Sequence, residues 1–253
     1  MKNFCIVILL VGILFSSCLP KKEILYLQGS QTNSTGNANY EPLIQNDDLL
    51  YINVSSGQIA AAAPFNLDYQ TEKGTSSTSG FASQKQTYLV DHNGNIEFPV
   101  LGTMAVSGYS INELRDELKN KLKSYLTDAV INIRIVNFKV TVTGEVNQPG
   151  VVTTTSQRFT LLDALAMSGD LTLYGKRDNI LVIRDFQGVK SYNRVDITKA
   201  DFVNSPFYYL DQNDFIYVEP RKAKIDSTAI GTNIPFIVSI VGILLTTTLI
   251  LTR

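Results

Sequence analysis

Residues 138–169 constrain the fold of this 253-residue chain more tightly than any other stretch. The stretch begins as a strand, because Val140 and Val142 alternate with polar residues at a period of two. Pro149 and Gly150 then supply a fixed φ angle followed by a residue that tolerates positive φ, which predicts a type II turn. A second strand, a short helix and further strands follow. Hairpin, helix and strand in this order indicate a β-grasp.

The short helix within this stretch carries its own start and stop signals. Thr160 is expected to cap it, with Asp163 three residues on in the capping-box position. Gly169 is expected to end it. The predicted buried side of the helix consists of Leu161, Leu162, Leu165 and Met167.

A second strongly patterned stretch, residues 87–102, predicts a β-hairpin. Asn93 and Gly94 form the pair that favours a type I′ turn. His92, the single histidine of the chain, falls in this turn and is expected to be solvated. The residues that flank the turn and are expected to face inward are Tyr88, Val90, Ile96 and Phe98.

Both stretches resemble one family. The first matches VxGxVxxPGxxxxxxxxTLLxAxxxxGG, the pattern of the soluble-ligand-binding β-grasp (SLBB) module in the Wza-type outer-membrane polysaccharide export proteins. One departure is Asp170, where that family usually has a second glycine. The second stretch is similar to YxVDxxGxIxFPxxG in the polysaccharide-export domain. The resemblance implies an α+β fold, with the export domain at residues 40–137 and the SLBB β-grasp domain at residues 138–220.

The export domain carries further signals. The letters QND precede a predicted strand at residues 45–47 and again at 212–214, so a similar turn-and-strand device opens the first domain and closes the second. Asn46 stands where the family usually has glycine, and asparagine tolerates the left-handed conformation. Ser110 and Glu113 predict a capping box. The helix that follows has an apolar stripe of Ile111, Leu114, Leu118 and Leu122, and a strand is expected at residues 128–137.

Residues 58–86 are less clearly patterned. Ala60 to Ala63 can form a helical turn that Pro64 interrupts, and the rest reads as loop. We interpret the segment as a tolerated surface insertion. A loop that faces a channel or a partner is the alternative.

Composition and motifs exclude several classes of function. Lys and Arg number 22 against 23 Asp and Glu, so the net charge is −1 and nothing indicates a nucleic-acid partner. No phosphate loop, dinucleotide fingerprint, nucleophile elbow or zinc spacing occurs. A carboxylate pair could still cleave a glycoside, but the best candidates, Asp47 and Asp48, are adjacent in a predicted turn. We therefore expect no enzyme, no cofactor and no metal site.

Residues 1–17 read as a signal peptide that stops at a cysteine. Lys2 precedes an apolar run too short to span a bilayer, and two serines precede Cys18. This resembles a bacterial lipoprotein signal, which implies that Cys18 carries lipid. An ordinary signal peptide with an incidental cysteine is the alternative. Residues 18–39 are then a lipidated tether, because they have too little apolar surface to offset the entropy of ordering.

The C-terminal end is predicted to enter a membrane. A charged linker at residues 221–233 precedes the predicted membrane helix at 234–252. Residues 234–251 are 18 consecutive residues without a charge, just long enough to span a bilayer. Ser239, Gly242 and Thr246 fall within one narrow sector of this helix. Small and hydroxyl residues suit either close helix packing or a wetted lumen. The sequence leaves both uses open, and a simple single-pass anchor is a third possibility.

The resemblance implies an outer-membrane exporter of capsular or extracellular polysaccharide. In that family several copies, typically eight, form a ring around a periplasmic lumen, and the terminal helices gather into a barrel through the outer membrane. The ring docks onto an inner-membrane polysaccharide co-polymerase of the tyrosine autokinase type. The expected partners are therefore the polysaccharide, the co-polymerase, further copies of the chain and outer-membrane lipids. The alternative is a periplasmic glycan-binding or scaffolding lipoprotein that forms no channel.

Overall fold

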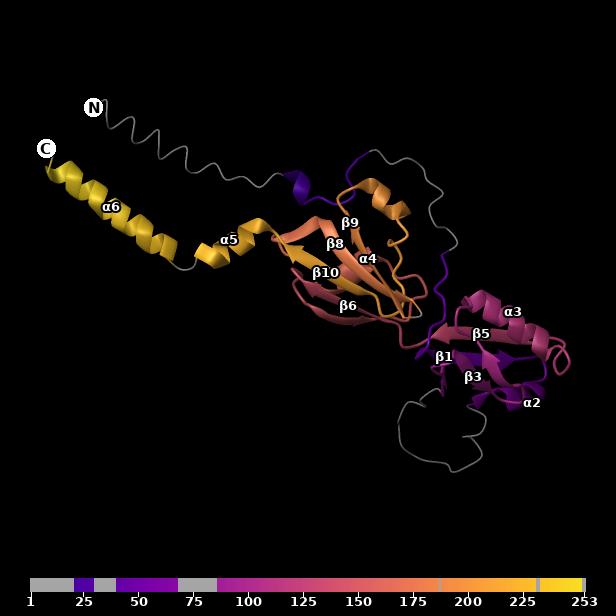
Figure 1. Cartoon of the computed structure of the whole chain (residues 1–253). Coiled ribbons are helices and arrows are strands. Elements are labelled where there is room, and N and C mark those ends of the chain that lie inside the picture. Colours follow the sequence, from indigo (N-terminus) through magenta and orange to yellow (C-terminus); the bar gives the residue numbers. More distant parts are fainter. Residues whose placement is uncertain (1–20, 30–39, 68–85, 187, 231–232, 252–253) are drawn as a thin grey trace.

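The computed structural model describes residues 21–29, 40–67, 86–186, 188–230 and 233–251. The described chain forms two α+β units in tandem, followed by two helices (Figure 1). The first unit lies within residues 40–137, where the export domain is expected. The second lies within residues 138–220, where the β-grasp is expected.

The first unit is built on a three-stranded antiparallel sheet in the order β2-β1-β5, with β3 and β4 forming a separate pair. Helix α3 packs against β5. Its predicted capping box forms, with Ser110 and Glu113 each accepting a hydrogen bond from the other's backbone N–H. The elements are β1 (Leu49–Ser55), α2 (Ile59–Ala62), the 3-10 helix η2 (Ala63–Phe65), β2 (Tyr88–Leu89), β3 (Asn95–Phe98), β4 (Gly102–Ala105), α3 (Ile111–Leu122) and β5 (Val130–Ile135).

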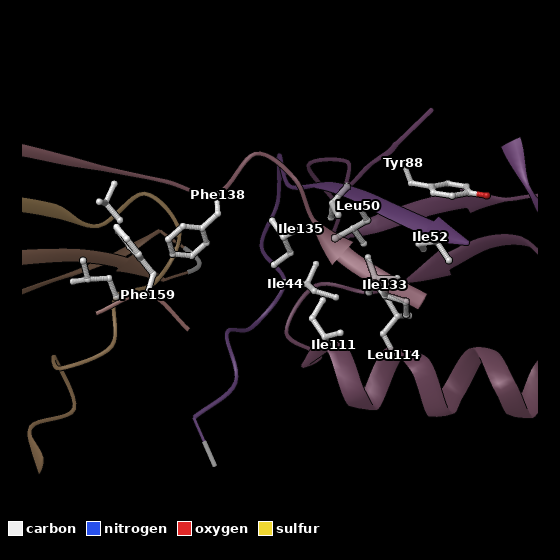
Figure 2. Close-up of a cluster of buried hydrophobic side chains, with 14 of the residues drawn as sticks. Ile44, Leu50, Ile52, Tyr88, Ile111, Leu114, Ile133, Ile135, Phe138 and Phe159 are labelled. Carbon is white, nitrogen blue, oxygen red and sulfur yellow. The ribbon is translucent and has the colours of Figure 1, made fainter. Parts of the chain in front are cut away.

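The predicted inward faces of this domain are confirmed. Figure 2 shows Ile111 and Leu114 on α3 gathered with Ile44 and with Ile133 of β5. Phe138 and Phe159 lie on the other side of the domain boundary, in edge-to-face contact at 6.1 Å between ring centroids. The residues predicted to be buried that are at most 4 % exposed are Tyr88, Val90, Ile96, Phe98, Ile111, Leu114, Leu118 and Leu122.

The hairpin predicted at residues 87–102 is only partly correct. The turn is present, but β2 pairs with β1 and β3 pairs with β4. Of the expected type I′ pair, Gly94 has a positive φ of 81° and Asn93 does not, so the turn is not of type I′. The Asp91 carboxylate instead accepts hydrogen bonds from the backbone N–H groups of Asn93 and Asn95, at 2.9 and 2.8 Å. This side-chain acceptor holds the turn in its observed form.

The second unit is a five-stranded mixed sheet in the order β7-β6-β10-β8-β9. The last strand, β10, lies in the centre, parallel to β6 and antiparallel to β8, which is the arrangement of a β-grasp. The elements are β6 (Lys139–Gly144), β7 (Gly150–Thr153), α4 (Leu161–Met167), β8 (Gly175–Phe186), β9 (Val189–Val195), the 3-10 helix η4 (Ala200–Asn204) and β10 (Phe215–Pro220).

Helix α4 follows its sequence signals except at its end. The capping box between Thr160 and Asp163 forms as predicted. Met167, however, is 55 % exposed rather than buried, and Leu162 is only half-buried. The reason is spacing, because the buried positions are residues 161, 164, 165 and 168, a 3-and-4 pattern that leaves out Met167.

The type II turn expected at Pro149 and Gly150 is absent. Gly150 opens β7, pairs with Val142 and has no positive φ. The glycine that the fold requires lies earlier, since Gly144 has a φ of 91° and a Cβ there would lie 2.1 Å from the Val218 carbonyl oxygen. The close approach of β6 to β10 therefore sets the glycine requirement, not the turn at Pro149.

Part of the segment expected to be a tether packs against the β-grasp. Within residues 21–29, which include the 3-10 helix η1 (Lys21–Glu23), Leu27 donates a backbone hydrogen bond to Ile197 at 3.1 Å. Burial raises the pKa of Tyr26 to about 12 with help from its hydrogen bond to Asp170. The tether was predicted from the composition of residues 18–39 alone. That prediction did not consider the β-grasp residues Ile197 and Asp170, which supply contacts to the segment.

The C-terminal part is helical over most of its length. Helix α5 (Lys222–Ile230) occupies most of the expected linker at 221–233, and α6 (Asn233–Leu251) follows it (Figure 1). In the part of the chain that the structure covers, no helix meets the requirements of length and apolarity for a membrane crossing. The spanning role expected for residues 234–252 is thus not shown.

Candidate functional site at the domain junction

Two acidic turns meet where the two domains join. Residues 45–48 lead into β1, and residues 211–214 lead into β10. In each turn the third residue is left-handed, with φ 67° at Asp47 and 63° at Asn213. The carboxylate of the fourth residue accepts a hydrogen bond from the backbone N–H of the first, at 2.9 and 2.8 Å. The two turns are therefore structural equivalents.

The structurally equivalent residues of the two turns are not the ones that the shared letters QND align, because they are offset by one position. Asp47 occupies the position of Asn213, and Asn46 occupies the position of Gln212. The left-handed role expected of Asn46 is therefore wrong, because Asp47 has the positive φ. The shift occurs because the buried fourth residue, Asp48 in the first turn, closes the turn on the first N–H.

The buried aspartates of the two turns differ in their charge partners. Asp214 is fully buried and pairs with Arg184, at 2.7 Å between Nη2 and Oδ2. Arg184 also pairs with Asp211 at 2.9 Å. Burial raises the pKa of Asp214, and the Arg184 guanidinium opposes that rise.

Asp48 is equally buried but has no such cation. Among the described residues it makes no ion pair, and its Oδ1 atom has no hydrogen-bond partner. Burial raises the pKa of Asp48 to about 6, with the Gln45 backbone N–H and the Gln212 side chain opposing the rise. A carboxylate with unmet hydrogen-bonding capacity thus lies at the junction.

Asn137, between β5 and β6, joins the two turns. Its side chain donates to the Asp47 carbonyl and accepts from the Leu49 N–H, both at 2.9 Å. Its backbone carbonyl accepts a hydrogen bond from Gln212, which in turn accepts from the Lys139 N–H at 2.8 Å. The connection between the domains is hydrogen-bonded on both sides, which restricts their relative movement.

Tyr40 makes a second set of contacts between the domains. Its ring stacks on that of Tyr209 with centroids 4.6 Å apart and planes 9° apart. Its hydroxyl donates to the Leu210 carbonyl at 2.9 Å and also contacts the Asp211 carboxylate. Burial and the Asp211 carboxylate raise the pKa of Tyr40, so the hydroxyl stays protonated and remains a donor.

A cleft of about 580 Å³ opens between the domains beside the acidic turns. Its volume lies within the ~300–1,000 Å³ typical of small-molecule sites. The first unit contributes Gln45, Asn46, Asp47, His92, Asn93 and Ser107, and the β-grasp contributes Asp185, Phe186, Gly188 and Asn213. Polar and apolar surface contribute equally to this lining, which carries hydroxyl, amide, imidazole and carboxylate groups beside Phe186, so the cleft suits a ligand with both polar and apolar faces.

The residues that the sequence singled out do not gather in this cleft. Asn93 lines it, and Gly94 lies next in the same turn. Pro149 and Gly150 lie away from the lining, at the start of β7. Cys18 lies outside the described residues.

The expected stripe of small residues lies on α6. The Thr246 hydroxyl donates within its own helix, at 3.0 Å from the Gly242 carbonyl oxygen and 2.9 Å from that of Ile243. A Cβ added at Gly242 would meet nothing within 4 Å, so this position is open to a neighbour. Ser239, Gly242 and Thr246 therefore fit helix packing through small size more than through unused donors.

Sequence reasoning missed the cleft as a unit. The two QND turns can be recognised in the sequence, but their approach to one another depends on how the domains dock. The signal available in the sequence was that the same acidic turn occurs once in each domain, before and after the connection at Asn137. The repetition indicates that both domains use the same type of turn. It does not predict that the two turns lie beside one cleft.

Comparison with known families assigns both domains. Residues 36–136 match the family described as polysaccharide biosynthesis/export protein, and residues 138–218 match the SLBB domain. The chain thus contains a polysaccharide-export domain followed by an SLBB domain.

Two curated relatives share this region. Both are named EPS I polysaccharide export outer membrane protein EpsA. The one from Ralstonia solanacearum is 27% identical over 139 residues, which cover 53% of this chain and 36% of the relative. The one from Ralstonia nicotianae (strain ATCC BAA-1114 / GMI1000) is 31% identical over 109 residues, which cover 42% of this chain and 29% of the relative. The match therefore spans about a third of the length of these relatives.

Proposed function

We propose that the protein takes part in polysaccharide export at the outer membrane, as one subunit of a ring-shaped conduit. The observation that carries this proposal is the tandem of export and SLBB domains over residues 36–218, joined by a hydrogen-bonded connector. Its relatives' names supply the outer-membrane location. The mechanism is physical guidance of a hydrated polymer, and no covalent bond is made or broken.

Exposed apolar side chains on α6 support association with other copies. Phe236, Val238 and Ile243 are 64–69 % exposed in the single chain, and exposed apolar surface of this extent is usually covered by another molecule. In the proposed ring, α6 helices from neighbouring subunits pack along Ser239, Gly242 and Thr246 and meet the outer membrane with their larger apolar side chains.

Single cysteines test this arrangement of α6. In a background without Cys5, cysteines introduced one at a time from Phe236 to Leu251 should crosslink between subunits most readily at Ser239, Gly242 and Thr246. Labelling with a water-soluble thiol reagent reports separately whether a wetted lumen runs along the same stripe. Crosslinking without helical periodicity would contradict the packing proposal.

A lipid on Cys18 is the proposed second attachment to the membrane. Residues 21–29 hold the chain just after it against the β-grasp, and Glu23 pairs with Arg221 at the start of α5 at 2.7 Å. The lipidated end and the start of the C-terminal helices therefore leave the same domain close together. Replacing Cys18 with Ser should abolish labelling by a radioactive fatty acid, and unchanged labelling would refute the site.

The proposed partner on the inner side is a polysaccharide co-polymerase of the tyrosine autokinase type. Crosslinking in intact cells followed by mass spectrometry tests this contact directly. Crosslinks between the export domain and an inner-membrane co-polymerase support it.

The export role itself is tested by deletion and complementation. A strain that lacks the chain should retain polysaccharide inside the cell envelope and release little into the medium. The intact chain supplied in trans should restore release. Normal release from the deletion strain would contradict the proposed function.

The polar cleft favours one alternative, a glycan-binding or scaffolding lipoprotein that forms no channel. Such a protein uses the cleft for recognition and needs no closed ring. The oligomeric state of the purified protein separates the two functions, since only the conduit requires closed rings.

A further inference from the structure

The cleft between the domains holds polar side chains that the fold itself does not use. Several of its walls come from turns, so their side chains are free of strand and helix packing. Within the described ranges, the lining side chains that make no hydrogen bond or ion pair are Gln45, Asp47, His92, Asn93, Ser107 and Asn213. Their unused donors and acceptors come from both domains and converge on one space.

The chemistry of these groups suits neighbouring hydroxyls. A side-chain amide donates and accepts, a carboxylate accepts, and a serine hydroxyl or neutral imidazole does both. Adjacent hydroxyls of a sugar ring present the same mixture of donors and acceptors. Phe186 is 37 % exposed in the lining and offers an apolar surface for the C–H face of such a ring.

Charge narrows the class of ligand. Among the described residues, the lining contains two carboxylates, Asp47 and Asp185, and no lysine or arginine. Asp185 accepts a hydrogen bond from the Gly188 N–H at 3.0 Å, and Lys190 lies 3.8 Å from its other oxygen. Asp47 has no cation partner among the described residues. A uronate or other anionic group in this cleft therefore meets like charge, which disfavours binding.

We infer that the interdomain cleft is a binding subsite for a neutral, hydroxyl-rich saccharide segment. The inference rests on the proposed function in polysaccharide export, which brings such a ligand to the protein. Because the walls belong to both domains, a bound segment contacts the export domain and the β-grasp together. The subsite thus binds the exported polysaccharide weakly at the junction between the domains.

A divalent cation is the competing occupant, because carboxylate and amide oxygens are also calcium ligands. The described residues contain no group of three or more His, Cys, Asp or Glu side chains placed to hold a metal. Two carboxylates from separate domains are few for a dedicated calcium site. The saccharide therefore accounts better for the amides and for Phe186, and chelation separates the two occupants.

The test measures saccharide binding by the purified full chain in detergent. The probes are a panel of neutral oligosaccharides and a panel that contains uronic acids, each applied with and without EDTA. The cleft variants are Asn93→Ala and Asp185→Asn. Asn132→Ala is the matched control, since Asn132 is also an exposed asparagine but lies on β5 away from this cleft. Thermal midpoints confirm that each variant is folded, and Asp47→Asn supplies a second variant if Asn93→Ala unfolds.

The account predicts binding of at least one neutral oligosaccharide, weakened tenfold or more by Asn93→Ala and Asp185→Asn. Asn132→Ala and EDTA should leave it unchanged. Acidic oligosaccharides should bind at least tenfold more weakly, and Asp47→Asn should narrow that difference. Binding of no neutral probe, or binding that ignores the cleft variants or requires a divalent cation, would overturn the inference.

The same variants separate this inference from the proposed function. If they restore polysaccharide release in the deletion strain while no saccharide binds the cleft, the subsite is wrong and the export function stands. If the intact chain has no effect on release, the export function fails, whatever the cleft binds.

Discussion

Replacing Asp48 with Asn should raise the free energy of unfolding at neutral pH relative to its value at acidic pH. Replacing Asp214 with Asn should instead lower the free energy of unfolding at neutral pH. Asp48 is fully buried and has no cation partner in the described part of the chain, and its pKa is raised from 3.8 to about 6. A raised carboxyl pKa means that the folded state holds the proton more tightly than the unfolded state. Asp48 therefore contributes stability that is fully present below about pH 4 and is lost as pH rises through about 6.

The magnitude follows from the shift. About 2 pKa units at about 1.36 kcal/mol each correspond to about 3 kcal/mol of unfolding free energy lost between pH 3.5 and 7.5. Asn keeps an oxygen for the Gln45 N–H but does not titrate. The difference in unfolding free energy between Asp48→Asn and the parent should thus be about 3 kcal/mol more favourable at pH 7.5 than at pH 3.5. Any pH-independent cost of the amide cancels in this comparison.

Urea unfolding followed by circular dichroism at both pH values measures the effect. Asp214→Asn is the matched control, because it removes a buried carboxylate from the equivalent turn but leaves Arg184 short of a partner. That control should lose about 3 kcal/mol or more at pH 7.5. An Asp48→Asn variant whose effect is the same at both pH values would refute the reasoning.

Two further substitutions test the local structure. Gly144→Ala should lower the unfolding free energy by about 2–4 kcal/mol, because its Cβ meets the Val218 backbone, whereas Gly150→Ala, with open space around it, should change it by less than about 1 kcal/mol. Equal losses at the two glycines would contradict the assignment. Ser110→Ala should cost about 1 kcal/mol through loss of the α3 cap, measured by the same urea unfolding, and no loss would contradict the capping role.

The elements that the sequence predicted well are those whose signals are local. Capping boxes at Ser110 and Thr160 depend on residues three positions apart, and both form. The apolar stripe of α3 depends on a period of three and four, and it is buried throughout. Local spacing therefore sufficed for the helices and for the β-grasp layout.

The features that the sequence missed depend on distant partners. Gly150 was expected in a turn, but strand pairing with Val142 extends it. Asp47 rather than Asn46 is left-handed, in a turn whose Asp47 N–H donates to the distant Val90 carbonyl at 2.9 Å. The segment at residues 21–29 gains order from backbone contacts near Ile197. The cleft likewise exists only because two domains dock, and no local pattern encodes that approach.

The most direct test of the conduit is the shape of the assembly in the outer membrane. The protein should be extracted from membranes in mild detergent and imaged by electron microscopy, with its mass measured independently by light scattering. The account predicts closed rings with a central opening and a mass of several subunits. A uniform population of monomers at every detergent and protein concentration would contradict the conduit and favour the glycan-binding scaffold.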